Sequence, residues 1–180
     1  MEMENVKRME PSNVTPKLIK YLPENKSTMV QFIPGYVLKN SDFEREDLWE
    51  YIVRPIKTIH RSGIELPCTF NPQEEIIRLY KVLEGLKSKY PGFNIVETIV
   101  ILDKIAGVAD VPQSQYVPCH NDLLADNFIL VSNRDEFKGP MYLIDWEYGG
   151  MGPAYYDNRG YVSRNIGCEG NREEAFGDIF

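Results

Sequence analysis

Two stretches of the sequence decide the fold: HNDLLADNFIL at residues 120–130 and LIDWEYGGMGP at residues 143–153. Asn127 directly precedes an apolar run in the first stretch, and Asp145 directly follows an apolar run at the start of the second. If these two runs pair as one antiparallel hairpin, both polar residues lie at the same end of it, facing one cleft. Asp122 lies in the loop before the first run. Asp and Asn at strand ends often only cap turns. The three together at this spacing favour a functional site.

An Asp, an Asn five residues later and a second Asp after an apolar run are the side chains that Mg²⁺-dependent phosphoryl transfer requires. We expect Asp122 to act as the catalytic base, which accepts the proton of an attacking hydroxyl. Oxygen ligands such as those of Asn127 and Asp145 suit Mg²⁺. His120 is expected to support catalysis as a structural ring that hydrogen-bonds the loop main chain. The only other histidine is His60, so a zinc site is not expected.

Aromatic residues follow the second carboxylate and suggest the kind of substrate. Trp146, Glu147 and Tyr148 directly follow Asp145. Aromatic faces near carboxylates bind ammonium groups, so these three residues are candidate contacts for a cationic substrate. Ordinary packing is the alternative for the aromatic rings, and for Asp157 a helix cap is favoured over a cation contact.

The segment VQFIPG at residues 30–35 is a candidate nucleotide-binding linker. Its main-chain groups could pair with the edge of an adenine, while apolar side chains form the walls. The candidate nucleotide-binding residues are Gln31, Phe32, Ile33, Leu130 and Ile144. A plain connecting loop is the alternative interpretation of this segment.

Composition limits the class of protein. The chain has 180 residues, of which 43% are hydrophobic, so it can bury one substantial core. A formal charge of −7 argues against a nucleic-acid partner, which usually requires a basic surface. The sequence shows no apolar run of membrane-spanning length and no signal-peptide pattern, and its three cysteines are well separated. We therefore expect a cytoplasmic protein without membrane insertion; its oligomeric state is open.

The order of predicted elements indicates an α+β fold, because strands and helices do not alternate as βαβ units. The predicted elements are a helix end within 1–12, a hairpin of 18–22 and 29–33, a linker from Pro34, a helix from Ser41 or Asp42 to about Arg61, a helix from Pro72 to about 90 capped by Asn71, a buried helix over 95–109, a strand over 116–119, a hairpin of 128–131 and 141–144, and a C-terminal helix.

The two long motifs, with the linker segment, resemble the choline/ethanolamine kinase family, within the aminoglycoside-phosphotransferase-like group of protein-kinase-like folds. The resemblance implies residues 1–37 as a remnant of the N-terminal lobe and hinge, and 38–180 as a mainly helical C-terminal catalytic lobe. It implies transfer of the ATP γ-phosphate, with Mg²⁺, to the hydroxyl of choline or a similar small cationic alcohol. By resemblance, Asp122 is the base, Asn127 and Asp145 are magnesium ligands, and Tyr148 belongs to the choline pocket.

The sequence also departs from this family pattern. The first glycine is Gly35, so no Gly-rich loop precedes the linker. Lys17 and Lys20 come too late for the phosphate-binding lysine, while Glu2 or Glu4 could be the helix glutamate that pairs with it. We therefore expect a fragment, incomplete at both ends, with weak or no ATP turnover alone. The alternatives are a non-catalytic kinase-like binding module and a kinase for another small alcohol, such as thiamine or an aminoglycoside.

Overall fold

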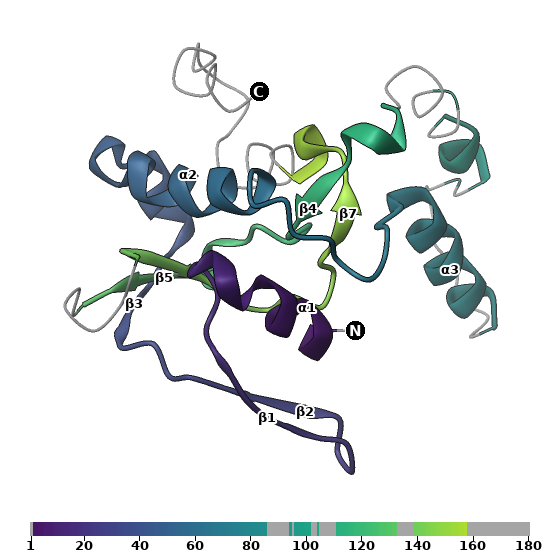
Figure 1. The fold of residues 1–180 in the computed structure, drawn as a ribbon. Helices are drawn as coiled ribbons and strands as arrows, with labels where there is room; N and C mark the ends of the chain where they lie inside the picture. Colours follow the sequence, from purple (N-terminus) through teal and green to yellow (C-terminus); the bar gives the residue numbers. More distant parts are fainter. Residues whose placement is uncertain are drawn as a thin grey trace.

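A computed structural model of the chain describes residues 2–85, 94, 96–101, 104, 111–132 and 139–157. The elements, in order, are α1 (Glu2–Met9), the 3₁₀ turn η1 (Glu10–Ser12), β1 (Leu18–Leu22), β2 (Ser27–Val30), β3 (Gly35–Val37), the turn η2 (Asn40–Glu44), α2 (Glu46–His60), α3 (Pro72–Gly85), the turn η3 (Gln113–Gln115), β4 (Val117–Cys119), the turn η4 (Ala125–Asn127), β5 (Phe128–Val131), β6 (Met141–Leu143) and β7 (Gly150–Gly152). Helices and small sheets are mixed along the chain, which confirms the α+β prediction (Figure 1).

Three strands form the sheet that carries the candidate site. β5 pairs antiparallel with β6, and Phe128 lies opposite Leu143, so the predicted hairpin is confirmed. β3 pairs antiparallel with the other edge of β5. The prediction of a linker is therefore wrong for residues 35–37, which form a strand. A Cβ at Gly35 would collide with the carbonyl oxygen of Leu130, and this close approach of two main chains explains why glycine is needed there.

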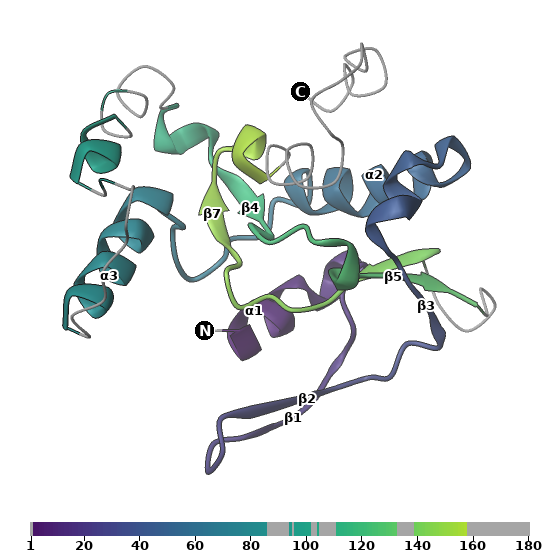
Figure 2. The same ribbon diagram turned by 180° about the vertical axis from the view of Figure 1, so that it is seen from behind.

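The main hydrophobic core joins the helices to one face of this sheet. Ile52, Ile56 and Ile59 recur on one side of α2 and are buried, in one cluster with Phe128 and Leu143. In Figures 1 and 2 the chain from β4 to β7 passes between α1 and α2. The loops that carry the polar motifs are therefore held by a helix on either side.

The first hairpin contacts this core at its base, through Leu18 and Val30. β1 and β2 pair antiparallel as a two-stranded sheet and extend away from the other described elements in both views (Figures 1 and 2). The predicted hairpin is confirmed, but its second strand is residues 27–30 and not 29–33. The division of the chain at residue 37 stays a prediction. None of the described helices combines the length and the apolar character that crossing a membrane requires.

The start of α2 differs from the prediction. The helix begins at Glu46, whereas Ser41 and Asp42 lie in the preceding turn η2. The Asp42 carboxylate accepts the main-chain N–H of Lys39 at 2.8 Å and the hydroxyl of Tyr36 at 2.9 Å. The Lys39 N–H bond is the main reason why the pKa of Asp42 is lowered. Asp42 therefore caps the short turn η2, and its prediction as a cap of the long helix was wrong.

The later helices match the predicted ones in part. α3 begins at Pro72, and Asn71 Oδ1 accepts the N–H of Glu74 at 3.3 Å, as expected of a cap. Residues 96–101 are helical, but Val96 and Val100 are 59% and 47% exposed, so the predicted burial is wrong there. The end of the second helix near residue 90, most of the third and the C-terminal helix lie outside the described residues.

Candidate active site

Asp122 and Asn127 are in direct contact in the loop between β4 and β5. The side-chain Nδ2 of Asn127 donates to the main-chain carbonyl of Asp122 at 2.8 Å and lies 3.3 Å from its carboxylate Oδ2. Asn127 is 6% exposed, whereas Asp122 is half-buried. Because the amide nitrogen makes both contacts, the amide oxygen Oδ1 is the atom that Asn127 can offer to a metal ion.

Asp145 is connected to Asp122 and Asn127 through the main chain of the preceding residue, Ile144. The N–H of Ile144 donates to the carbonyl of Asn127 at 3.0 Å, and the carbonyl of Ile144 lies 2.9 Å from Nε2 of His120. Asp145 has a φ of 67°, a left-handed conformation that Asp adopts more readily than most residues, and it is exposed. The structure therefore brings Asn127, Asp145 and the Asp122 loop to one end of the β5–β6 hairpin.

His120 is fully buried and orients this loop with both ring nitrogens. Nε2 donates to the carbonyl of Ile144, and Nδ1 accepts the N–H of Asp122 at 3.3 Å, so the neutral ring carries its proton on Nε2. Burial lowers the pKa of His120, and the opposing effect of the Asp157 carboxylate is weaker. These main-chain bonds are the structural part of the role predicted for His120.

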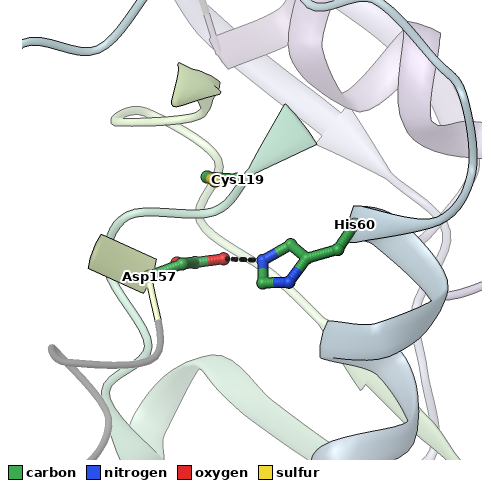
Figure 3. Close-up of side chains that lie close together, drawn as sticks. All are labelled: His60, Cys119 and Asp157. Atoms are coloured by element: carbon green, nitrogen blue, oxygen red, sulfur yellow. Dashed lines mark hydrogen bonds and ion pairs between the residues drawn. The ribbon is translucent and has the colours of Figure 1, made fainter. Parts of the chain in front are cut away.

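Asp157 holds the same loop from another segment, which the sequence did not indicate. It lies in the helical turn 154–157 after β7 and is 1% exposed. Its carboxylate accepts the main-chain N–H of His120 at 3.1 Å and that of Asn121 at 2.7 Å, and it lies 3.0 Å from Nε2 of His60 (Figure 3). The helix that it was expected to cap lies outside the described residues.

Trp146 belongs to the core and does not face a ligand. The indole is 0% exposed, donates from Nε1 to the carbonyl of Leu143 at 3.3 Å, and packs 4.7 Å from the His120 ring, centroid to centroid. This burial contradicts the predicted substrate contact of Trp146. On α1, the buried Asn5 donates from Nδ2 to the carbonyls of Trp146 at 2.9 Å and Gly149 at 2.8 Å. Asn5 is thus a support of the turn after Asp145 that the sequence did not reveal.

The first helix also places a carboxylate near the site. Burial raises the pKa of Glu2, and the negative charges of Asp145 and Glu147 raise it further, so the three carboxylates lie near one another. Glu4, by contrast, forms an ion pair with Arg8 at 3.0 Å on the surface of the helix. Of the two candidates for the helix glutamate, Glu2 is therefore the one whose pKa the charge of Asp145 raises.

A cavity of about 470 Å³ opens beside the turn that follows Asp145. Its walls come from the loop before α3, the start of α3 and that turn, and they comprise Cys68, Thr69, Phe70, Asn71, Glu74, Glu75, Arg78, Glu147, Tyr148 and Gly149. The rings of Phe70 and Tyr148 meet edge to face at 6.3 Å, and Tyr156 lies 5.7 Å from Phe70. The carbonyl of Tyr148 accepts Nδ2 of Asn121 at 2.9 Å. The cavity is therefore linked directly to the loop that carries Asp122.

The five candidate nucleotide-binding residues do not line a single surface. Ile33 is buried against Val131 and Tyr142 on one face of the sheet, whereas Leu130 packs against the main core on the other. Phe32 is 83% exposed, and the N–H of Gln31 donates to the carbonyl of Lys17 at 2.8 Å. Ile144 is half-buried at the end of the hairpin. Nucleotide contact by these residues stays a prediction.

Comparison with known proteins identifies relatives of the chain. A model of the choline/ethanolamine kinase family matches residues 1–161. A choline/ethanolamine kinase of Rattus norvegicus is 29% identical over 161 residues, which are 86% of this chain and 38% of that protein. A LicA homolog of Mycoplasma capricolum is 26% identical over 167 residues, 83% of this chain and 62% of that protein. The chain therefore spans less than two thirds of the length of either relative, 38% of the first and 62% of the second.

Solved structures show the same fold. The choline kinase LicA from Streptococcus pneumoniae superposes with a TM-score of 0.79 over 98% of this chain and 60% of that one, at 23% identity. Spectinomycin phosphotransferase superposes with a TM-score of 0.55 over 98% of this chain and 63% of that one, at 13% identity. The predicted kinase-like fold is thereby confirmed. With the family model matched over residues 1–161, the chain belongs to the choline/ethanolamine kinase family.

Proposed function

We propose that the chain supplies the catalytic lobe of an ATP- and Mg²⁺-dependent phosphotransferase. Its acceptor is the hydroxyl of a small cationic alcohol, with choline the first candidate. One observation carries the proposal: the contact between Asp122 and Asn127 lies beside a cavity with aromatic and acidic walls, and Asn121 joins the two through the carbonyl of Tyr148.

Asp122 acts as the base in this reaction. Its carboxylate accepts the proton of the substrate hydroxyl as the oxygen bonds to the γ-phosphorus and the bond from that phosphorus to ADP breaks. Asn127 holds the Asp122 carboxylate and carbonyl through Nδ2, and His120 holds the Asp122 N–H. Three hydrogen bonds thus orient the base before a substrate arrives, which is the positioning that this kind of catalysis requires.

The residues at the end of the hairpin fit a magnesium ion. Oδ1 of Asn127 and the exposed carboxylate of Asp145 are hard oxygen donors, and Mg²⁺ takes one or two such ligands while it keeps waters and phosphate oxygens. When bound, Mg²⁺ neutralises the charge that develops on the phosphates. Glu2 adds a third carboxylate near Asp145 and Glu147, so this end of the site is strongly acidic and favours a cation.

The cavity supports a cationic alcohol as the acceptor. Phe70 and Tyr148 offer aromatic rings, on which an ammonium group is attracted to the ring face. Glu74 and Glu147 add negative charge, while the cation Arg78 is paired with Glu75. The cavity walls are therefore net negative, which favours choline or ethanolamine over a neutral alcohol.

Calorimetric titration of the purified chain with choline tests this proposal, with and without Mg-ATP, together with detection of phosphocholine by ³¹P NMR. We expect choline to bind more tightly when Mg-ATP is present, and the variants Phe70→Ala and Tyr148→Ala to weaken binding about tenfold, the order of a desolvated cation–π contact. Tyr21→Ala, on the separate β1–β2 hairpin, is the matched control and leaves binding unchanged. Absence of choline binding contradicts the proposed acceptor, and a panel of ethanolamine, thiamine and an aminoglycoside then identifies another.

A non-catalytic binding module is the second candidate. The cavity beside Tyr148 favours it, because its aromatic and acidic walls can hold a cation whether or not a nucleotide is bound. Choline binding that is unaffected by Mg-ATP, without phosphocholine formation, supports the binding module over the phosphotransferase.

A further inference from the structure

We propose that a groove between the turn η1 and the exposed side of α2 binds a small polyanion, a molecule that carries a diphosphate or more than one phosphate group. The groove has a volume of about 750 Å³, which lies within the range of small-molecule sites. None of its lining residues belongs to the candidate active site. The proposal therefore goes beyond the proposed function and does not depend on it.

The groove carries more positive than negative charge, although the whole chain has a formal charge of −7. Arg54, Lys57 and Arg61 follow one another at helical spacing along α2 and its C-terminal cap, and all three line the groove. Glu50 is the one carboxylate among the lining residues. A concave surface that is lined mainly by one sign of charge concentrates ions of the opposite sign.

The three cations are available to a ligand. Within the described part of the chain, neither Lys57 nor Arg61 forms an ion pair. Arg54 pairs there with Glu50 at 3.9 Å, and the two side chains are 59% and 84% exposed, so this pair contributes little. An incoming anion therefore does not have to break a strong ion pair.

The hydroxyl groups of the groove are already used as donors. Each of them donates to a main-chain carbonyl nearby in the sequence, at 2.6 or 2.8 Å; they belong to Ser12, Thr58 and Ser62. The charged side chains are thus the donors that remain for a ligand. Guanidinium groups match phosphate oxygens with two parallel N–H bonds, and an ammonium group adds a point charge. Because a monoanion neutralises only one of the three cations, a polyanion fits the groove better.

Both walls of the groove are held in place by the main core. Met9, directly before η1, is fully buried, and the carbonyl of Val14 after η1 accepts the N–H of Leu143 at 2.7 Å. On the other wall, Ile52 and Ile56 anchor α2 in the same core. The groove is therefore formed before a ligand arrives, and binding does not have to order either wall.

The groove also has room for more than the phosphate groups. A second cavity of about 290 Å³ shares Ser12, Arg54 and Thr58 with it and extends to Pro140. Arg54 borders both cavities, so a phosphate bound to its guanidinium has space on either side. This space suits the organic part of a phosphorylated small molecule.

A purely structural role is the competing explanation for these cations. Lys57 and Arg61 lie at the C-terminal end of α2, where a positive charge stabilises the partial negative charge of the helix end. That effect is confined to the last turn of a helix, and Arg54 lies further from the end. The structural role therefore does not account for all three cations, and it predicts no anion binding.

Isothermal titration calorimetry of the chain with pyrophosphate, in metal-free buffer at constant ionic strength, tests the proposal. We expect one saturable site. Lys57→Gln and Arg61→Gln each weaken binding about tenfold, the order of one charge-assisted hydrogen bond. Lys20→Gln, which removes one exposed positive charge from β1, is the matched control and stays within about twofold, because salt screens distant charges.

Nuclear magnetic resonance of the ¹⁵N-labelled chain locates the site. Pyrophosphate is expected to shift the amide signals of Ser12 and Arg61 and to leave those of His120 and Asn121 unchanged. Shifts confined to His120 and Asn121 place the anion at the candidate active site and overturn the proposal.

The remaining outcomes each decide for or against the groove. Saturable binding that both groove variants weaken, and Lys20→Gln does not, supports the proposal. No saturable binding, or equal weakening in all three variants, overturns it. A polyglutamate peptide that binds through Lys57 and Arg61 while pyrophosphate does not also overturns it, in favour of an acidic protein segment. Where a Gln variant does not fold by circular dichroism, Lys57→Met or Arg61→Met replaces it. These measurements need neither nucleotide nor choline, so their failure is distinguishable from failure of the proposed function.

Discussion

Nδ2 of Asn127 lies 2.8 Å from the carbonyl of Asp122 and 3.3 Å from its carboxylate. The residue proposed to hold the metal therefore also holds the proposed base, with a different atom of the same amide. This double use means that substitutions at Asn127 affect both the metal and the base, and that the two functions of Asn127 are separable by the choice of substitution.

Asp122→Asn is expected to lower kcat for choline phosphorylation by about 10²–10⁴-fold, the usual contribution of a general base. The substitution preserves size and leaves the N–H of residue 122 bonded to His120, so the fold by circular dichroism and the affinity for choline are unchanged. Asp126→Asn, an exposed carboxylate in the turn η4, is the control and keeps full activity. A variant at position 122 that keeps its activity excludes Asp122 as the base. Where this chain alone turns over too slowly, a longer relative that carries the same motif is used.

Asn127→Asp and Asn127→Ala separate the two functions of Asn127. Asp retains an oxygen ligand but loses the donor to Asp122, whereas Ala loses both. Titration of Mn²⁺ in the presence of ADP, followed by electron paramagnetic resonance, is expected to show affinity kept within about threefold in Asn127→Asp and lost by about tenfold or more in Asn127→Ala and Asp145→Ala.

Phosphoryl transfer falls in both Asn127 variants, because both release Asp122. Asn25→Ala, in the turn of the exposed β1–β2 hairpin, controls for loss of a surface amide. Equal Mn²⁺ affinity in Asn127→Asp and Asn127→Ala contradicts the assignment of Asn127 as a ligand.

The sequence predicts the site well where local pattern controls it. Asn127 and Asp145 flank two apolar runs, and pairing of those runs in one hairpin brings them to the same end. β3 was missed because a three-residue strand that starts at Gly35 after a proline has the local features of a turn. It becomes a strand only by pairing with residues 129–131, nearly a hundred positions along the chain.

Long-range contacts explain the other differences. Asn5 and Asp157 bond main-chain groups, which are the same for every residue type, at sequence separations of up to 144 and 37. No local pattern encodes such partners. Trp146 was assigned to the substrate because aromatic residues near carboxylates bind cations, but the same residue type also fills cores, and the sequence does not distinguish the two uses.

His120 gives the stability of the chain a defined pH dependence. Burial lowers its pKa in the folded state below the ordinary value of 6.5, so the unfolded chain binds more protons as the pH falls. The contribution of His120 is therefore complete above pH 6.5 and is lost as the pH falls from there towards the folded-state pKa, by up to about 1.4 kcal/mol per pH unit. Urea unfolding between about pH 5 and 8 measures this. In His120→Gln this part of the change of the unfolding free energy with pH disappears. An unchanged pH dependence in that variant contradicts the role given to His120.

Asn5 gives the last prediction, because its side chain bonds two carbonyls in the turn after Asp145. Asn5→Ala removes one donor from each of the carbonyls of Trp146 and Gly149, which keep the N–H of Gly149 and Sγ of Cys68. We therefore expect the free energy of unfolding to fall by about 1–3 kcal/mol, from about 0.5–1.5 kcal/mol per hydrogen bond lost. Asn5→Asp has the same shape but places an acceptor against two acceptors, so it is expected to be less stable than Asn5→Ala. Lys7→Ala, on the exposed face of α1, changes stability by less than about 0.5 kcal/mol. Urea unfolding of the three variants measures this order, and stability of Asn5→Asp equal to that of the parent chain shows that Asn5 does not hold the turn through Nδ2.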